Sequence, residues 1–393
     1  MKLAIVTHFV RPNDGQGGVN DAVVREALRR GWQVTLIASD IAHDLETMPG
    51  VTWINIAPGR LPSRLLKYQA FAFKSAAWLK RHRNEFDIVH VNGFITWARS
   101  DVNAVHFVHN GWLHSGYYPF TFFRSFYAAY QSCFTRLNAA LEKKAFANTK
   151  VVVAVSDRVA AELRDAGVKT DIEVIYNGSD VAGFAAATRN RAYFNVPEDK
   201  FLCLFAGDLK ITRKNLDTVL RALVKVNDRV ELVVAGILKG SPYPALAKEL
   251  GLEKRVHFIG HVKDMKTLMA SCDCLVFPSR YDPFALVVLE AMAVGMPVVT
   301  SSKVGAAALV KKCGGVVLED PDDVDGLANA ITHIEGDPAA RAVMQRAAKA
   351  EALHYTWEAM SEQYVDLYER LLRSGAPTRR SPAGAVIEPS AKT

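Results

Sequence analysis

The segment from Phe277 to Thr300 constrains the fold more than any other part of the chain. Its pattern is that of a strand end, a loop, a helix, a tight turn and a new strand. The predicted helix, residues 284–294, is apolar on every face except for one carboxylate, Glu290. Because a helix that is hydrophobic all round is buried, this segment predicts a buried helix that follows one strand and leads into the next.

The carboxylate of Glu290 needs an explanation, because burying an unpaired charge is costly. Either it has a protein partner, or it faces a cleft and holds a ligand. A capping role is not available to Glu290, which favours the ligand. Asp282 lies eight residues earlier, at the predicted helix entrance. Asp-Pro is a common helix opening, so for Asp282 both a cap and a ligand contact stay open.

The spacing of these two acids suits a nucleotide-sugar. A helix N-terminus offers free N–H groups and a positive dipole end, which suit a phosphate. From residue 284 to residue 290 the helix axis advances about 9 Å at 1.5 Å per residue. A diphosphate would then lie at the N–H groups of Phe284, Ala285 and Leu286. The ribose hydroxyls would reach Glu290, and the sugar would reach Asp282.

Residues 282–299 have the sequence Asp-Pro-Phe-Ala-Leu-Val-Val-Leu-Glu-Ala-Met-Ala-Val-Gly-Met-Pro-Val-Val. This run resembles the signature of the retaining glycosyltransferases of family 4, also called group 1, which have the GT-B fold. Their usual signature is Glu-Pro-Phe-Gly-Leu-x-x-x-Glu-Ala-Met-Ala-x-Gly-x-Pro-Val-Val. Two positions depart from it. Asp282 is one methylene shorter than the usual Glu, and Ala285 adds a methyl group where the family has Gly.

Strands and helices alternate along the whole chain, which predicts an α/β protein with parallel sheets covered by helices. The expected strands are residues 3–7, 33–38, 51–54, 88–91, 105–108, 151–155 and 173–175, followed by 201–206, 231–235, 256–259, 274–277, 297–300 and 316–318. The polar, Ala-rich stretch 177–200 between the two series has the composition of an interdomain linker. We therefore expect two doubly wound, Rossmann-like domains that face each other across a cleft, with ligands at the carboxyl ends of the strands.

The domain limits follow from this division. Residues 1–180 are expected to form the acceptor-side domain, and residues 181–355 the nucleotide-sugar-binding domain. The helical spacing of residues 356–373 is similar to the family's terminal helix, and the resemblance implies that this helix crosses back onto the first domain. Residues 374–393 are rich in Pro, Ala, Ser and Arg, and are predicted to be disordered.

Two cations precede a second predicted helix, which lies earlier in the chain. Arg213 and Lys214 stand before a helix that is expected to start near Asn215. Cations at a helix N-terminus oppose its dipole, which favours an anion between them. The resemblance implies that both bind the donor diphosphate and neutralise the leaving nucleotide. The family's usual Gly-Arg pair is Gly207-Asp208 here, which leaves Lys210 as the substitute cation. A solvated basic loop is the alternative.

A glycine-rich segment, residues 13–20, follows the first strand. Gly17 and Gly18 would let the backbone approach a phosphate or a sugar, and the resemblance places this loop over the donor phosphates or the acceptor. Gly15 and Gly17 with Asp40 also imitate a dinucleotide fingerprint. The third glycine of that fingerprint is absent, so NAD binding is the weaker interpretation. An ordinary flexible turn is the remaining interpretation of this segment.

Among the histidines, His109 follows a predicted strand end on the cleft side. The resemblance implies a His in this loop near the reacting sugar. His8, His90, His106 and His114 are competing assignments. The resemblance also places the backbone of Val262 near the nucleotide base, and it identifies Ala308 as a third departure, because the family has Glu there.

Composition narrows the partners. The net charge of +7 and the pI near 9 favour anionic partners. No nucleic-acid-binding signature occurs, however, so we expect no binding to nucleic acid. No apolar run approaches the length of a spanning helix. Five cysteines, an odd number, with no secretory leader predict a reducing cytoplasm. Cys272-x-Cys274 is expected to be structural rather than a zinc site.

Two segments suggest an apolar or membrane-facing surface. Arg60–Arg83 holds seven Lys or Arg and no acid, interleaved with aromatic and Leu residues. This pattern suits either an anionic membrane face or an amphipathic helix with a basic solvated side. Tyr117–Phe134 is dense in aromatics, which favours either a packed helix or a pocket for a lipid or aromatic acceptor.

The sequence therefore predicts a cytoplasmic glycosyltransferase that is peripheral on the inner face of the membrane. It would move a sugar from a UDP- or GDP-linked donor to a carbohydrate or lipid-linked acceptor, with retention of configuration, in glycolipid or surface polysaccharide synthesis. No metal or other cofactor is expected, because Asp320-Pro321-Asp322 has the pattern of a turn. The expected catalytic residues are Asp282, Lys214, Arg213 and His109. The expected donor-binding residues are Glu290, Phe284, Ala285, Leu286, Val262, Gly17 and Gly18. The alternatives are a sugar-nucleotide epimerase, a non-catalytic sugar-nucleotide-binding protein and an NAD-dependent oxidoreductase.

Overall fold

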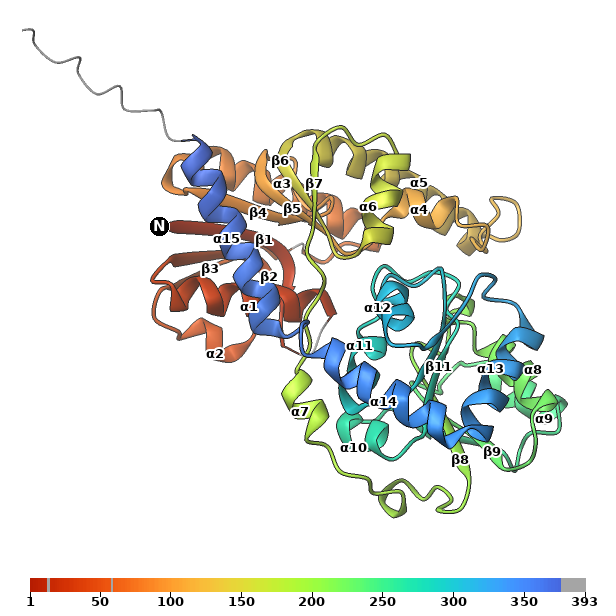
Figure 1. Ribbon diagram of the computed structural model, residues 1–393. Coiled ribbons are helices and arrows are strands. Elements are labelled where there is room, and N and C mark those ends of the chain that lie inside the picture. The colour runs from red at the N-terminus through yellow and green to blue at the C-terminus, as the bar shows by residue number, and fades with distance from the viewer. Residues whose placement is uncertain (13–14, 58, 376–393) are drawn as a thin grey trace, which may run out of the picture.

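The computed structural model describes residues 1–12, 15–57 and 59–375. The first half of the chain forms a seven-stranded sheet in the order β3-β2-β1-β4-β5-β6-β7 (Figure 1). Its strands are β1 (Lys2–Val10), β2 (Gln33–Ile41), β3 (Val51–Asn55), β4 (Ile88–Asn92), β5 (Ser100–Val105), β6 (Thr149–Ala154) and β7 (Asp171–Val174). Every neighbouring pair is parallel, and Leu3 at the centre lies beside both Val34 and Ile88.

The second half forms a six-stranded parallel sheet in the order β10-β9-β8-β11-β12-β13. Its strands are β8 (Phe201–Ala206), β9 (Val230–Ala235), β10 (Val256–Gly260), β11 (Cys274–Phe277), β12 (Val298–Ser301) and β13 (Val316–Leu318). All six residues of β9 are buried, as expected for a strand that helices cover on both faces. The predicted pair of parallel-sheet α/β units is thus confirmed.

Helices join the strands in both halves. In the first half they are α1 (Gly15–Arg29), α2 (His43–Glu46), α3 (Arg64–His82), η1 (Arg83–Glu85), α4 (His109–Leu113), α5 (Phe126–Ala147) and α6 (Asp157–Asp165). The second half has α7 (Val181–Ala185), η2 (Ala192–Phe194), η3 (Thr212–Lys214), α8 (Leu216–Lys225), α9 (Tyr243–Glu249), α10 (Met265–Ala270), α11 (Leu286–Val294), α12 (Ala307–Lys312), α13 (Val324–Gly336), α14 (Pro338–Ala352) and α15 (Trp357–Gly375).

The predicted strand at residues 105–108 was wrong, because the fifth strand runs from Ser100 to Val105. The strand contains the polar residues Asp101 and Asn103, so it lacks the apolar run that predicts a buried strand, yet both residues are buried. Asp101 accepts hydrogen bonds from Arg83 at 2.7 Å and from the Val89 amide at 2.8 Å. Buried polar groups that find such partners cost little. These partners are tertiary, so a pattern of apolar residues could not reveal this strand.

The helix α15 lies against α1 and the first sheet (Figure 1). Tyr364 and Tyr368 of α15 are fully buried in that core. The Tyr368 hydroxyl lies 2.5 Å from His90 Nδ1, and Arg30 of α1 pairs with Asp366 at 2.6 Å. Of the tail expected to be disordered, residues 374 and 375 belong to α15, and residues 376–393 lie outside the described residues. Within the described ranges, no helix is long and apolar enough to span a membrane.

Candidate functional site

A cavity of about 380 Å³ lies between the two α/β units, where loops follow the carboxyl ends of strands from both sheets. This is the position at which doubly wound sheets bind ligands. The first unit contributes Gly15, Gln16, His106, Val155 and Asn177 to its wall, and the second contributes Ala206, Gly207, Asp208, Lys214, Phe277 and residues 282–287. Four of the residues expected to bind or act on the donor come together here with Asp282, namely Lys214, Phe284, Ala285 and Leu286.

Lys214 and Asp282 form an ion pair in the cavity wall. Both side chains are mostly buried, with 15% and 11% of their surfaces exposed. Burial would raise the pKa of Asp282, but Lys214, then Arg213, and the Phe284 amide together hold that pKa below its usual value. The amide donates to Asp282 Oδ1 at 3.2 Å. Asp282 is therefore an ionised carboxylate that both caps a turn and faces the cavity.

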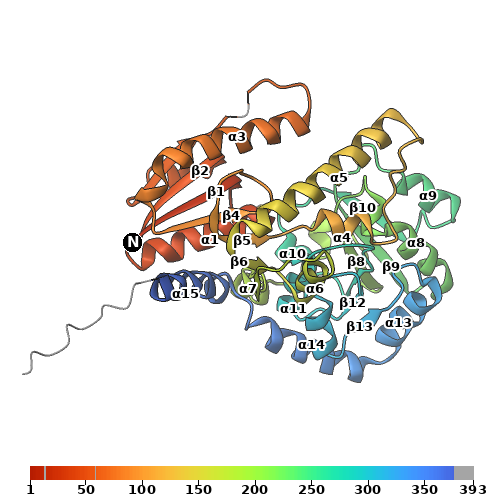
Figure 2. The ribbon, with the colours of Figure 1, turned by 90° about the horizontal axis from the view of Figure 1, so that it is seen from above.

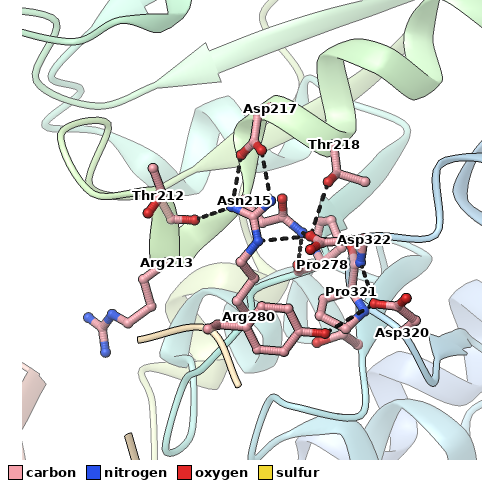
Figure 3. Close-up of polar contacts among 12 residues, drawn as sticks. Thr212, Arg213, Asn215, Asp217, Thr218, Pro278, Arg280, Asp320, Pro321 and Asp322 are labelled. Carbon is pink, nitrogen blue, oxygen red and sulfur yellow. Dashed lines mark hydrogen bonds and ion pairs between the residues drawn. The ribbon is translucent and has the colours of Figure 1, made fainter. Parts of the chain in front are cut away.

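A dense polar cluster fixes the turn η3, which carries Arg213 and Lys214 (Figure 3). Asn215 has a left-handed backbone, with φ of 70°, and its buried side-chain amide donates to the carbonyls of Pro278 and Pro321 at 2.9 and 2.7 Å. This left-handed residue ends η3 and starts α8. The cluster thus sets where the cations of the turn point.

Arg280 is the centre of this cluster. Its guanidinium binds both carboxylate oxygens of Asp217, at 3.1 and 2.7 Å, and Asp322 at 2.8 Å. It also donates to the Thr212 carbonyl at 2.7 Å, while its backbone amide donates to the Arg213 carbonyl at 2.8 Å. Figure 3 shows the Arg213 side chain directed away from the cluster, and its guanidinium lies 5.5 Å from the Phe107 ring centroid. No pattern in the sequence indicated a role for Arg280.

The helix α11 starts at Leu286, two residues later than predicted, and Ala285 is its N-cap. Ala285 has φ of 69°, a left-handed conformation that costs about 1 kcal/mol for a residue with a Cβ. Ala285, Leu286 and Val287 line the cavity, so first-turn amides that have no helical acceptor border it. The Phe284 amide, expected to bind phosphate, instead bonds Asp282.

Glu290 lies one helical turn beyond Leu286 and Val287, on the same face of α11. It is half-buried. Burial raises the pKa of Glu290 to about 7, and only the nearby charge of Lys266 opposes this. In the described ranges its carboxylate has no hydrogen-bond or ion-pair partner. Glu290 itself does not line the cavity, whose wall on α11 ends at Val287. An unpaired, half-buried acid one turn from that wall is nevertheless more typical of a ligand contact than of a structural bridge.

The glycine-rich segment meets the cavity earlier than expected. Gly15 and Gln16 line the cavity wall, whereas Gly17 and Gly18 lie inside α1 and do not line it. The physical reason is the helix start at Gly15, which buries the two later glycines. A Cβ at Gly18 would lie 3.4 Å from the Trp357 ring of α15. The expected residues Asn13 and Asp14 lie outside the described residues.

Two histidines follow β5, one on the loop and one at the start of α4. Because β5 ends at Val105, His106 rather than His109 follows the strand end, and His106 lines the cavity. Burial lowers the pKa of His106 to about 4, and its Nε2 atom is buried without a partner in the described ranges. His109 starts α4 and lies outside the cavity wall; its Nδ1 is 2.5 Å from the buried Glu142.

The other histidines that competed for this role do not border the cavity. His8 stacks on Tyr68, His90 pairs with Tyr368, and His114 contacts the Asn110 carbonyl. Val262 follows β10 and packs at the edge of the second core rather than in the cavity wall. Asn177, whose Oδ1 is buried and unpartnered in the described part of the chain, lines the cavity and was missed.

The loop after β11 also joins the two units, through one side chain and one backbone carbonyl. The Tyr281 hydroxyl lies 3.1 Å from the Val108 carbonyl oxygen and 2.8 Å from Glu162. Ser156 donates to the Pro283 carbonyl at 2.7 Å. Residues 281 and 283 flank Asp282, so the contacts between the units hold both neighbours of Asp282 in the chain.

Comparisons with known proteins match both halves of the chain. The family "Glycosyltransferase Family 4" matches residues 13–182, and "Glycosyl transferases group 1" matches residues 187–351. The D-inositol 3-phosphate glycosyltransferase of Mycolicibacterium paratuberculosis is 27% identical over 96% of this chain and 91% of its own length.

Solved structures agree in fold. Sucrose-phosphate synthase from Thermosynechococcus elongatus has a TM-score of 0.78 at 21% identity, covering 95% of this chain and 100% of its own. HepE from Anabaena, solved with UDP and glucose, has a TM-score of 0.69 at 21% identity, covering 94% and 100%. These likenesses, with the two parallel sheets, confirm the fold that the sequence predicts.

Proposed function

Because the chain belongs to the family 4, group 1 glycosyltransferases, which have the GT-B fold, we propose that its central cavity binds a nucleoside diphosphate sugar. The protein transfers that sugar to an acceptor hydroxyl with retention of the anomeric configuration. The observation that carries this proposal is the Lys214–Asp282 pair beside the first turn of α11. Cation, free amides and carboxylate there match the diphosphate and the hydroxyls of one donor.

The donor lies along α11 in this proposal. Its diphosphate occupies the space between Lys214, Arg213 and the amides of Ala285 and Leu286, where the helix dipole favours an anion. Its ribose hydroxyls donate to Glu290, one turn further along the helix. Phosphate draws Lys214 away from Asp282, so that the carboxylate accepts a hydrogen bond from the sugar. The solved complex of HepE with UDP and glucose supports UDP as the first nucleotide to test, with GDP as the second.

The chemistry needs a leaving group that is stabilised as it departs. The bond between the anomeric carbon and the β-phosphate oxygen breaks, and the acceptor oxygen bonds that carbon from the same face. The acceptor proton passes to the departing phosphate oxygen. Lys214 and Arg213 stabilise the charge that develops there, a role worth several kcal/mol at a preorganised site. In this proposal the acceptor approaches His106, which lies in the cavity wall, and His109, whose ring contacts Glu142.

The acceptor is a carbohydrate or a lipid-linked precursor of a glycolipid or surface polysaccharide, handled on the cytoplasmic face of a membrane. The basic residues of Arg60–Arg83 support this setting, since anionic lipid attracts them. The name of the mycobacterial relative adds a phosphorylated cyclitol to the acceptor classes worth testing.

A donor panel tests this function. The full chain is incubated with UDP- and GDP-sugars with and without candidate acceptors, released nucleoside diphosphate is measured, and the product anomer is read by NMR. Acceptor-dependent release and a retained anomer are expected. Asp282→Asn should lower turnover at least a hundredfold, while Asp325→Asn, at an exposed position on α13, leaves it unchanged. Donor conversion that needs no acceptor would instead indicate an epimerase.

A further inference from the structure

Four large aromatic side chains stand in solvent where the chain enters α5. The exposed fractions are 53% for Phe122, 96% for Phe123, 99% for Phe126 and 63% for Tyr127. We call these four residues the aromatic tip. Figures 1 and 2 show the loop between α4 and α5 projecting beyond the first sheet. Single exposed apolar residues are ordinary, but a contiguous group of large rings marks an interaction surface.

The two stretches of sequence that form the tip and the neighbouring helix α3 carry charge of one sign. Residues 47–84 and residues 102–141 contain nine Lys or Arg and no Asp or Glu. The two runs touch: the Leu65 amide at the start of α3 donates to the Tyr130 hydroxyl of α5 at 3.3 Å. Phe126 is one helical turn from Tyr130, so the basic start of α3 and the aromatic tip lie together. Two acids of the other unit lie near Tyr117: Asp320 contacts its hydroxyl at 3.1 Å, and the charge of Asp322 also acts on it.

We propose that the aromatic tip and three cations, Arg60 in the segment before α3 and Arg64 and Lys67 in its first turn, form one docking surface for an anionic lipid bilayer. The rings enter the boundary between headgroups and acyl chains, and the cations bind lipid phosphates. A second copy of the chain fits this surface poorly, since two surfaces with only positive charge repel each other.

Docking at the tip would bring a lipid-linked acceptor close to the cavity. This step rests on the proposed function. The rings of Phe134 and His109 lie 6.1 Å apart, and His109 contacts Phe107, the neighbour of His106 in the cavity wall. From residue 126 to residue 134 the axis of α5 advances about 12 Å. A lipid-linked acceptor held at the tip therefore has its polar end about 12 Å further along α5, toward the cavity.

Vesicle sedimentation tests the proposal on the full chain. The wild type is mixed with phosphatidylcholine vesicles with or without 30% phosphatidylglycerol. Binding to the anionic vesicles is expected to be at least tenfold tighter and to weaken in high salt. The variant Phe123→Ser/Phe126→Ser should lose about tenfold in partitioning, and Lys67→Glu should lose most of the preference for anionic lipid. Tyr193→Ser and Lys248→Glu, at exposed positions in the second unit, are the matched controls and should bind like the wild type.

Two further readouts keep the result decisive. Thermal shifts by nucleotide-sugars, measured on the same proteins, should be equal in wild type and tip variants, which separates this proposal from the proposed function. A Phe123→Trp protein should gain fluorescence quenching by brominated lipid relative to the wild type. Equal vesicle binding by the wild type and the tip variant would overturn the proposal. So would absent vesicle binding, or a wild-type dimer in solution that the tip variant abolishes.

Discussion

The two carboxylates of the site differ because of their immediate neighbours. Asp282 lies between Lys214 and the Phe284 amide, which outweigh its burial and keep its pKa low. Glu290 is on an apolar helix whose nearest opposing charge is Lys266, and its pKa rises to about 7. Environments that separate the pKa values of two acids in this way give the acids different roles. Asp282 is charged at any physiological pH, whereas Glu290 titrates within the physiological range.

Donor affinity should therefore depend on pH through Glu290. The ionised carboxylate accepts hydrogen bonds from the ribose, so affinity for a UDP-sugar should rise severalfold from pH 6 to pH 8. A Glu290→Gln protein should show a flat profile across that window by calorimetric titration. Because the native pKa of Glu290, about 7, exceeds its ordinary value of 4.5, the native state keeps this proton to a higher pH than the unfolded chain does. Wild-type stability relative to Glu290→Gln should fall as pH rises from about 4.5 to 7. Donor affinities that change with pH to the same extent in the wild type and in Glu290→Gln would show that Glu290 does not bind the donor.

Ala285 offers a test of backbone strain. Its φ of 69° suits glycine better than alanine, so Ala285→Gly should raise the free energy of unfolding by about 0.5–1 kcal/mol in urea denaturation. Ala291→Gly, in the middle of the same helix, is the matched control and should lower that free energy by at least about 1 kcal/mol. Destabilisation by both substitutions would show that Ala285 is unstrained.

Among the elements, those that the sequence predicts well are apolar runs. All thirteen expected strands correspond to observed strands, although the fifth overlaps only at Val105. Because this strand was predicted too late in the chain, His109 rather than His106 was assigned to the strand end. The buried Asp101 that disguised this strand takes its partners from η1, β4 and Lys150. Such tertiary satisfaction leaves no local pattern.

The turn η3 shows the same limit. Arg213 and Lys214 were predicted from their place before a helix, but the groups that hold them were not. Arg280 reaches Asp217, 63 residues away, and Asp322, 42 residues away. Neither separation has a helical or strand period. A sequence can thus indicate which cations bind a phosphate, while the cluster that orients them requires the folded structure.

Arg280→Lys should separate these two contributions. Lysine keeps the charge but loses the paired hydrogen bonds to Asp217, so η3 loosens. Nucleotide-sugar affinity should fall about tenfold, equivalent to about 1.4 kcal/mol, with little change in the far-UV spectrum. Arg221→Lys, at an exposed position on the same helix as Asp217, should bind like the wild type. Unchanged affinity in Arg280→Lys would mean that η3 holds its shape without the cluster.

Across the whole molecule, Tyr281 links the two units beside Asp282. Its buried hydroxyl contacts Val108 and Glu162 of the first unit, and each such hydrogen bond contributes about 1 kcal/mol net. The hydroxyl has one proton, so Tyr281→Phe removes about one such bond. It should therefore raise the population of molecules in which the two units have moved apart about fivefold in the absence of ligand. Small-angle scattering should report a larger radius of gyration that a bound nucleotide-sugar restores.

Tyr364→Phe is the control for this change. The Tyr364 hydroxyl is buried in the first core without a partner among the described residues, so its removal should leave both the radius of gyration and turnover unchanged. Identical scattering from the wild type and Tyr281→Phe would show that the units are held together by other contacts, such as that of Ser156 with Pro283.

Calorimetric titration of the full chain with UDP- and GDP-sugars tests the central claim most directly, since the claim is that Lys214 and the start of α11 bind a donor diphosphate. We predict that at least one donor binds with a micromolar Kd, and that Lys214→Ala weakens it ten- to a hundredfold. Lys210, which the sequence offered as a substitute cation, is exposed on the loop before η3 and does not line the cavity, so Lys210→Ala should leave the Kd unchanged. Binding of every donor with equal affinity to the wild type and Lys214→Ala, or binding of none, would contradict the account.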